Sequence, residues 1–422
     1  MADSVHTHDR SDLGDGLVLR SAGNTQDIER VAEFNGSIHG QGVTEMTRNL
    51  FTHHPSKHVE DLIFVEDSQS GEVVSSLCLI PWTWRYGDVD IAAGEMGIVG
   101  TREGYRHRGL IRAQVALFKR RLEERGCLLS HIQGIPYYYR QFGYEYALPL
   151  EGGVQLELRD VPAAPDAGIT FQLATPDDVP TLMRLHDEAA QDLTICAVRD
   201  EQVWRYLLIH TQETEMAREI WLIQRADGET AGYLGVPEHH FGEELVVNEV
   251  SRLGFDAALA ALRHLKTLAL KREKPGIRLN LPAGCTLMRL ARSLGARDLG
   301  TYAWQIHVPD VVALLRTLAP VLERRIAGSP FAGLTRDVRV RLYRETIRLR
   351  FQEGRLSEVA SLGFSGGEEI SFPPLQFIPL VLGYRTWEEL HATYPDVRIA
   401  PAWRLLVDTL FPKVAAFIYT IY

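Results

Sequence analysis

The residues best suited to chemistry lie between an apolar segment that ends at Thr101 and an amphipathic run that follows it. In order they are Arg106, His107, Arg108, Gly109, Leu110, Ile111 and Arg112. Glycine lets the backbone approach a ligand closely, and the first N–H groups of a helix have no partner within the helix. Together with the helix dipole and nearby arginines, such a helix start favours a bound anion. Residues 106–112 therefore predict a cradle for a phosphate or pyrophosphate.

A second motif begins thirty residues after Gly109. In Tyr139-Arg140-Gln141-Phe142-Gly143-Tyr144, a tyrosine stands four residues before a glycine that would close a short helix. Tyr137 and Tyr138 come directly before it, so the spacing to Gly143 selects Tyr139. Packing is the simpler interpretation for its two neighbours.

Both motifs need strands and a helix to position them. Glu95 to Thr101 is expected to form a strand that leads into the loop, and Leu128 to Gln133 the next strand. The helix expected between them has apolar residues at helical spacing, namely Ile111, Val115, Phe118 and Leu122. Its apolar face would anchor it, and its start would stay open.

The pattern of the first segment returns in the middle of the chain. The helix start at residues 24–28 is matched by residues 175–179, with Asp27 and Asp178 lying 151 residues apart. Arg140 to Gly143 is matched by Arg292 to Gly295, at an offset of 152. Such agreement indicates a duplicated fold. The second copy has Asp256 near its equivalent helix start, where a carboxylate would repel a pyrophosphate, so we expect a structural copy without that ligand.

A chain of 422 residues is long enough for about three domains. We expect a disordered tail over 1–15, a first copy over 16–160, a Pro/Ala/Gly linker over 161–168, a second copy over 169–308 and a different domain over 309–422. In the last domain, Asp310 is expected to cap a helix, and Val338 to Phe351 to form a β-hairpin with a turn at Glu353-Gly354.

Taken together, the loop and the Tyr139 motif resemble the GNAT superfamily of N-acetyltransferases, whose coenzyme A loop reads Arg/Gln-x-x-Gly-x-Gly/Ala. Ile111 departs from the last small position, but Arg-x-Arg-Gly-Leu-Ile is similar to the Eis-like (enhanced intracellular survival) form. The chain also resembles Eis-like enzymes in its length and its C-terminal third. The resemblance implies an α+β / α/β fold with two tandem GNAT-like mixed-sheet domains and a C-terminal sterol-carrier-protein-like α+β domain.

The same resemblance implies transfer of acetyl from acetyl-CoA to a primary amine, aminoglycoside-like or lysine-like, by direct attack in a ternary complex. Val99, Gly100 and Thr101 are then expected to present the strand backbone to the pantetheine and the thioester carbonyl. Residues 106–112 would hold the pyrophosphate. Tyr139 would protonate the leaving thiolate as a general acid.

The attacking amine must lose a proton, and the sequence leaves several bases open. Glu95 and His131 lie on the two neighbouring strands, although a salt-bridged carboxylate and a hydrogen-bonded core histidine are simpler interpretations. The apolar end of the chain, residues 417–422, favours burial of the Tyr422 α-carboxylate, which desolvation would make more basic. In Eis-like enzymes the C-terminal carboxylate is believed to play this part. Tyr139 and Tyr422 are therefore the predicted catalytic residues.

Other features narrow the possibilities. Trp82 and Trp84 share a strand face and are expected to line the substrate pocket or pack in the core. The net charge of -10 disfavours nucleic acid as a partner, and no apolar run is long enough to cross a membrane. Four scattered cysteines predict a reduced, cytoplasmic protein without a metal. His53, His54 and His58 are expected in a mobile loop on the substrate side.

The resemblance also implies a homo-oligomer, such as a hexamer. Two alternative functions remain open, both with a non-catalytic GNAT scaffold. One is an apolar-ligand or lipid carrier that works through the C-terminal domain, and the other is an acyl-CoA-binding regulator.

Overall fold

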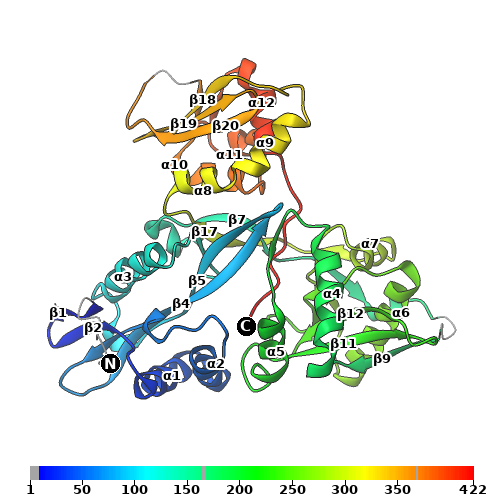
Figure 1. Cartoon of the computed structure of the whole chain (residues 1–422). Coiled ribbons are helices and arrows are strands. Elements are labelled where there is room, and N and C mark those ends of the chain that lie inside the picture. Colours follow the sequence, from blue (N-terminus) through cyan, green and yellow to red (C-terminus); the bar gives the residue numbers. More distant parts are fainter. Residues whose placement is uncertain (1–8, 164–167, 367–368) are drawn as a thin grey trace.

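The protein is described by a computed structural model that covers residues 9–163, 168–366 and 369–422. Figure 1 shows a blue-to-cyan N-terminal lobe, a green middle lobe, and a yellow-to-red C-terminal lobe above the other two. The last residues return from the upper lobe as an extended segment between the lower ones. Helices and mixed sheets occur in every lobe, which confirms the predicted α+β, multi-domain fold class.

The first sheet has strand order β1-β2-β3-β4-β5-β6-β17-β7, and β10 attaches to β4. Its strands are β1 (Ser11–Gly14), β2 (Leu17–Ser21), β3 (Leu62–Asp67), β4 (Val73–Tyr86), β5 (Val89–Thr101), β6 (Leu129–Ile132), β7 (Glu145–Glu151), β10 (Ile195–Ala197) and β17 (Tyr302–His307). The helices of the N-terminal lobe that pack on it are α1 (Thr25–His39), α2 (Gln41–Thr52) and α3 (Leu110–Glu124).

Side chains along the central strands point alternately to the two faces of the sheet, so this lobe has two cores. On β3, Leu62 and Phe64 pack in the cluster of α1 and α2, whereas Ile63 and Val65 pack in the cluster of α3. Successive side chains of a strand point to opposite faces, so each residue has one assigned side. The sheet is therefore a middle layer, with α1 and α2 on one face and α3 on the other.

The second copy repeats this order in two four-stranded sheets, β14-β12-β11-β9 and β13-β15-β8-β16. Its strands are β8 (Val154–Glu157), β9 (Ile169–Leu173), β11 (Arg218–Arg225), β12 (Thr230–Pro237), β13 (Leu245–Val247), β14 (Glu249–Val250), β15 (Gly276–Leu279) and β16 (Arg297–Asp298). Its helices are α4 (Val179–Ala190), α5 (Glu201–Ile209), α6 (Phe255–Lys271) and α7 (Thr286–Ser293).

The two copies exchange a strand. β8 precedes the expected linker but pairs with β15 and β16, whereas β17, from the end of the second copy, lies between β6 and β7. The expected division into 16–160 and 169–308 therefore needs correction, because main-chain pairing crosses residues 161–168 in both directions. Residues 164–167 of that linker lie outside the described residues.

The start of the chain also differs from expectation. Within the tail expected over 1–15, residues 11–14 form β1 and pair with β2, so this part is ordered. Asp9 forms an ion pair with Arg121 of α3. Residues 1–8 lie outside the described residues.

The C-terminal lobe has one sheet with strand order β20-β19-β18-β21-β22. Its strands are β18 (Arg336–Arg341), β19 (Thr346–Gln352), β20 (Arg355–Ser361), β21 (Ile370–Ser371) and β22 (Arg398–Ile399), and its helices are α8 (Val311–Thr317), α9 (Ala319–Ala327), α10 (Pro374–Val381), α11 (Trp387–Thr393) and α12 (Arg404–Leu410). Asp310 caps α8 through the Ala313 N–H, as predicted. The predicted hairpin is β18–β19, and Glu353-Gly354 turns between β19 and β20.

The final segment of the chain is bound along its length. The Thr194 N–H donates to the Ala415 carbonyl at 2.7 Å, and the Phe417 N–H donates to the Ile195 carbonyl at 3.0 Å. Phe417, Ile418, Tyr419 and Ile421 are each at most 7% exposed. The apolar end is therefore buried between the lower lobes, as its composition predicts.

Candidate active site

Residues 106–112, which we call the anion loop, run into the open start of α3. Gly109 precedes α3 with a left-handed φ of 77°, and His107 has a φ of 64°. No side chain among the described residues caps α3 by a hydrogen bond, and a Cβ placed on Gly109 would meet nothing within 4 Å. Arg106, Arg108 and Arg112 are exposed and form no ion pair with any described residue. The loop thus offers free N–H groups and unpaired cations on one surface.

A buried polar contact fixes this helix start to the sheet. Ser75 Oγ lies 2.6 Å from Gln114 Oε1, 2.8 Å from Thr101 Oγ1 and 3.0 Å from the Gly100 carbonyl oxygen. Gln114 is in the second turn of α3 and is fully buried. The end of β5 and the start of α3 are therefore held in one geometry.

The two central strands, β5 and β6, separate partway along their length. β5 and β6 pair in parallel from Ala93 with Leu129 to Glu95 with His131. Beyond Glu95, the outer part of β5 pairs with β4 alone among the described strands, and a register shift there accompanies a φ of 48° at Ile98. Val99, Gly100 and Thr101 lie in this outer part, so one edge of their backbone faces away from any strand.

Four predicted residues meet where the strands separate. The Tyr422 hydroxyl donates to Glu95 Oε1 at 2.8 Å, and the Tyr422 ring lies edge-on to Trp82 with centroids 6.0 Å apart. His131 Nε2 lies 3.5 Å from Glu95 Oε2. Burial, followed by the neighbouring Glu95, raises the pKa of the Tyr422 phenol well above its ordinary value, so this phenol is a hydrogen-bond donor at neutral pH.

Three indoles surround His131. Its ring centroid lies 4.9 Å from that of Trp82, 4.7 Å from Trp84 and 5.0 Å from Trp304. Six buried atoms here have no hydrogen-bond partner among the described residues: Glu95 Oε2, both ring nitrogens of His131, and Nε1 of Trp82, Trp84 and Trp304. Buried polar atoms without a hydrogen-bond partner are uncommon in folded proteins, so a cluster of six sets this site apart from an ordinary core.

Two arginines that the sequence did not single out, together with His54, hold the end of the chain. Arg199 Nε donates to the Thr420 carbonyl at 2.8 Å, and Arg218 Nη2 donates to the Tyr422 carbonyl oxygen at 3.4 Å. His54 Nε2 lies 3.2 Å from the Ile421 carbonyl oxygen. His54 is 1% exposed, so its expected place in a mobile loop is wrong. Burial lowers the pKa of Arg218 to about 10, which leaves it cationic at neutral pH beside the terminus.

Glu249 compensates these buried charges. Its carboxylate bonds both Nη atoms of Arg199, at 2.5 and 3.0 Å, and lies 3.7 Å from Arg218. Burial opposes the charged form, but the attraction of Arg199 and then Arg218 lowers the pKa of Glu249 to about 2. Paired and hydrogen-bonded charges of this kind can stay ionised inside a protein.

Tyr139 follows β6 in the chain and lies in the short helix η4 (Tyr138–Phe142), which Gly143 closes with a φ of 91°. It is 5% exposed, and burial raises the pKa of its phenol, which keeps it protonated. A Cβ on Gly134 would come within 2.2 Å of Tyr139 Cε2, so the ring rests directly on this glycine. Gln305 Nε2 and the Tyr302 hydroxyl both donate to the Gly134 carbonyl.

The equivalent helix start in the second copy, that of α6, carries an aspartate in its first turn. Asp256, in the first turn of α6, accepts a hydrogen bond from the Ala257 N–H and pairs with Arg225 at 2.6 Å. A diphosphate there would meet a carboxylate, as the sequence predicts. Among the described residues no group of three or more metal-ligating side chains gathers, and no described helix has the length and apolarity needed to cross a bilayer.

Solved structures share the fold over nearly the whole chain. A GCN5-related N-acetyltransferase from Anabaena variabilis ATCC 29413 is similar with a TM-score of 0.70 and 16% identity, over 95% of this chain and 99% of that one. A probable N-acyltransferase from Enterococcus faecalis V583 follows with a TM-score of 0.69 and 14% identity, covering 96% and 100%. Eis1 from Mycobacterium abscessus has a TM-score of 0.65 and 16% identity, covering 96% and 100%.

No curated protein matches the sequence. Residues 24–147 match a family model described as an acetyltransferase (GNAT) domain. This segment contains β5, β6, the anion loop, α3 and Tyr139. The chain therefore carries a GNAT acetyltransferase domain, and it is an acyltransferase.

Proposed function

We propose that this enzyme transfers the acetyl group of acetyl-CoA to a primary amine of an aminoglycoside-like or lysine-like acceptor. The observation that carries the proposal is the open start of α3, with its uncapped N–H groups and three unpaired arginines at the end of a separated strand. Free amides and cations are the groups that a diphosphate requires. The pantetheine arm would then pass along the outer part of β5, beside the backbone of Val99, Gly100 and Thr101.

Transfer proceeds by direct attack. The neutral amine attacks the thioester carbonyl, a C–N bond forms, the C–S bond breaks, and the sulfur leaves with a proton. Tyr139 supplies that proton, because its buried phenol stays protonated at neutral pH. The three cysteines of the GNAT-bearing lobe, Cys78, Cys127 and Cys196, are buried, which agrees with transfer without a covalent intermediate.

The terminal carboxylate of Tyr422 removes the proton from the amine. Glu95 and His131 are 3% and 0% exposed, whereas Tyr422 is half-buried, so the end of the chain is the most accessible of the three candidate bases. Arg218 beside the terminus stabilises its negative charge. Glu95 then acts as a positioning residue, because it accepts the hydrogen bond that fixes the Tyr422 ring. Trp82, which touches Tyr422, lines the acceptor side, and Trp84 packs behind it.

The acceptor class, a sterol-carrier-like C-terminal lobe and a homo-oligomeric assembly such as a hexamer are carried over from the sequence resemblance to Eis-like enzymes, and the fold shared with Eis1 agrees with that resemblance. The free cysteines agree with a reducing, cytoplasmic setting. These parts of the proposal depend on resemblance and shared fold, whereas the coenzyme site depends on the geometry of α3.

Thiol release from acetyl-CoA tests the proposal across aminoglycosides, polyamines, arylamines and lysine peptides. We expect release that requires an amine, and a KM for acetyl-CoA that rises at least tenfold in Arg108→Glu. Arg159→Glu is the control, because the Arg159 side chain is 83% exposed and lies outside the loop. Coenzyme binding without turnover for any amine would instead favour a regulator, and equal KM values in both variants would reject the loop.

A further inference from the structure

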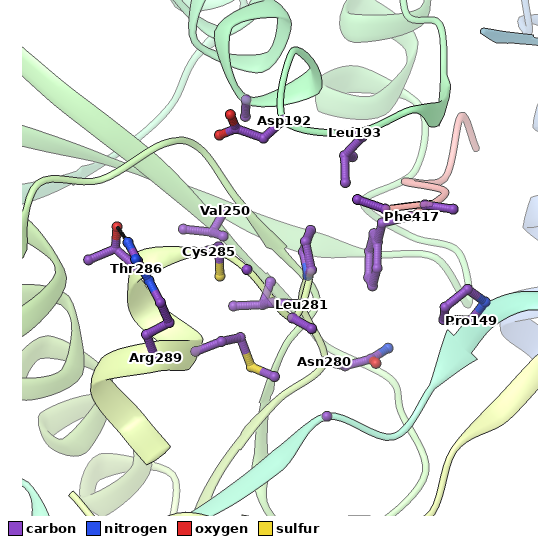
Figure 2. Close-up of a pocket in the computed structure, with 18 of the residues that line it drawn as sticks. Pro149, Asp192, Leu193, Val250, Asn280, Leu281, Cys285, Thr286, Arg289 and Phe417 are labelled. Atoms are coloured by element: carbon purple, nitrogen blue, oxygen red, sulfur yellow. Dashed lines mark hydrogen bonds between the residues drawn. The ribbon is translucent and has the colours of Figure 1, made fainter. Parts of the chain in front are cut away.

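The second copy contains a cavity of about 800 Å³, separate from the anion loop. Its walls come from residues 250–253, which begin at the last residue of β14, from residues 280–286, which follow β15, and from residues 414–417 of the final segment. Among the lining residues in Figure 2, Thr286 and Arg289 lie at the left, and Phe417 and Pro149 lie at the right. Ligand cavities in proteins have volumes of roughly 300–1,000 Å³, so this one would hold a small organic molecule.

The cavity occupies the place that corresponds to the coenzyme cleft of the first copy. β13 pairs in parallel with β15, whereas β14 pairs with β12, so the strand that corresponds to β5 also leaves its neighbour halfway. α7 follows β15 as η4 follows β6. The start of α6, where a diphosphate would bind, carries the carboxylate of Asp256. The second copy therefore has a cleft between its separated strands, but it has no helix start that could bind the diphosphate of a nucleotide.

The walls select for an apolar body. Leu193, Leu253, Leu281, Met288 and Phe417 line the cavity, and Phe417 is 7% exposed. Leu193 and Phe417 lie together on one side in Figure 2, with Leu281 opposite them. A ligand that covers these side chains would remove apolar surface from water on both partners.

The charges favour an anionic head group. Asp192 pairs with Arg252 at 2.6 Å, and Asp298 pairs with Arg292 at 2.8 Å, so these acids are neutralised. Glu151 lies 3.5 Å from Arg278. Arg289 has no carboxylate within 4.0 Å in the described parts of the chain, and its guanidinium touches Thr286 Oγ1 at 3.4 Å. The cavity therefore carries one uncompensated positive charge, beside a hydroxyl.

We propose that this cavity binds an amphipathic carboxylate, such as a medium-chain fatty acid, with the carboxylate at Arg289 and Thr286 and the apolar body toward Leu281 and Phe417. An amine is disfavoured, because every acid in the wall already has an arginine partner. This site is independent of acetyl transfer in the first copy, and it places apolar-ligand binding in the middle lobe.

Calorimetric titration of the full chain with decanoate tests the site, with and without coenzyme A. We expect one decanoate per chain under both conditions. Arg289→Glu should weaken binding at least tenfold, and Leu281→Trp should weaken it by placing an indole in the apolar part of the cavity. Arg159→Glu, an exposed charge reversal elsewhere, should bind as the wild type does.

Thermal melts and amine-dependent thiol release of the same variants separate loss of the site from loss of the fold or of catalysis. Arg289 is exposed on α7, so Arg289→Glu remains informative even where Leu281→Trp fails to fold. The proposal is overturned if decanoate does not bind, if Arg289→Glu binds it with unchanged affinity, or if decylamine binds as tightly as decanoate.

Discussion

Among single residues, Tyr139 has the central role, as the proton donor to the leaving sulfur. Tyr139→Phe removes the hydroxyl but keeps the ring on Gly134, so the fold should persist. We expect kcat to fall about 10²–10⁴-fold, the usual contribution of a general acid, with nearly unchanged affinity for acetyl-CoA. Steady-state thiol release and calorimetry measure the two quantities. Full turnover in this variant would remove Tyr139 from the mechanism.

Two substitutions of Glu95 distinguish a positioning role for this residue from a role as the general base. Glu95→Gln keeps an oxygen that can accept the hydrogen bond from Tyr422, whereas Glu95→Ala removes it. If the terminal carboxylate is the base, Gln should retain kcat within a few-fold and Ala should lose at least tenfold. The pH profile of kcat/KM should be unchanged in Glu95→Gln. An equal and large loss in both variants would make Glu95 the base.

At the scale of elements, the close contact between Gly134 and the Tyr139 ring controls the site. Gly134→Ala places a methyl group where the ring now lies, and it should displace Tyr139, lower kcat at least tenfold and cost about 1–3 kcal/mol of stability. Gly300→Ala is the matched control, since a Cβ there meets nothing within 4 Å. Thermal melts and thiol release should distinguish the two. Equal behaviour of both variants would contradict the packing argument.

Local signals in the sequence predicted those elements whose cause is local. The N-cap at Asp310, the left-handed Gly109 before α3 and the Gly143 that closes η4 each follow from a few neighbouring residues. The burial of the chain end follows from its apolar composition. These features determine where the anion loop and Tyr139 lie.

Features that depend on distant pairing were not predictable. β17 lies against β6 although about 170 residues separate them, and periodicity says nothing about such a partner. For the same reason, the sequence predicted residues 154–157 (β8) as part of the first copy and residues 11–14 (β1) as part of a disordered tail. Arg199 and Glu249 form a fully buried pair, but in a single sequence buried and exposed charges look alike.

At the scale of the whole molecule, buried histidines link stability to pH. Burial lowers the pKa of His54 and His186 to about 4, from an ordinary value of 6.5. The unfolded chain therefore binds more protons between pH 6.5 and 4, and stability should fall as the pH drops through this window. Each group contributes at most about 1.4 kcal/mol per pH unit. Because the pKa of Glu249 is lowered to about 2, its contribution is lost from about pH 4.5 downward.

Urea unfolding at a series of pH values checks this dependence. His54→Gln should flatten the slope between pH 6.5 and 4, whereas His239→Gln, at an exposed position, should leave it unchanged. Stability that rises on acidification would contradict the assignment of these histidines as buried and neutral.

The grip of α3 on a diphosphate is tested most directly by calorimetric titration with acetyl-CoA and with S-acetylpantetheine, which has the thioester arm but no diphosphate. We expect saturable heat with acetyl-CoA, at least hundredfold weaker binding of S-acetylpantetheine, and a lower affinity for acetyl-CoA in Arg108→Glu. Equal affinity for the two thioesters, or no heat with acetyl-CoA, would contradict the binding of a diphosphate by α3.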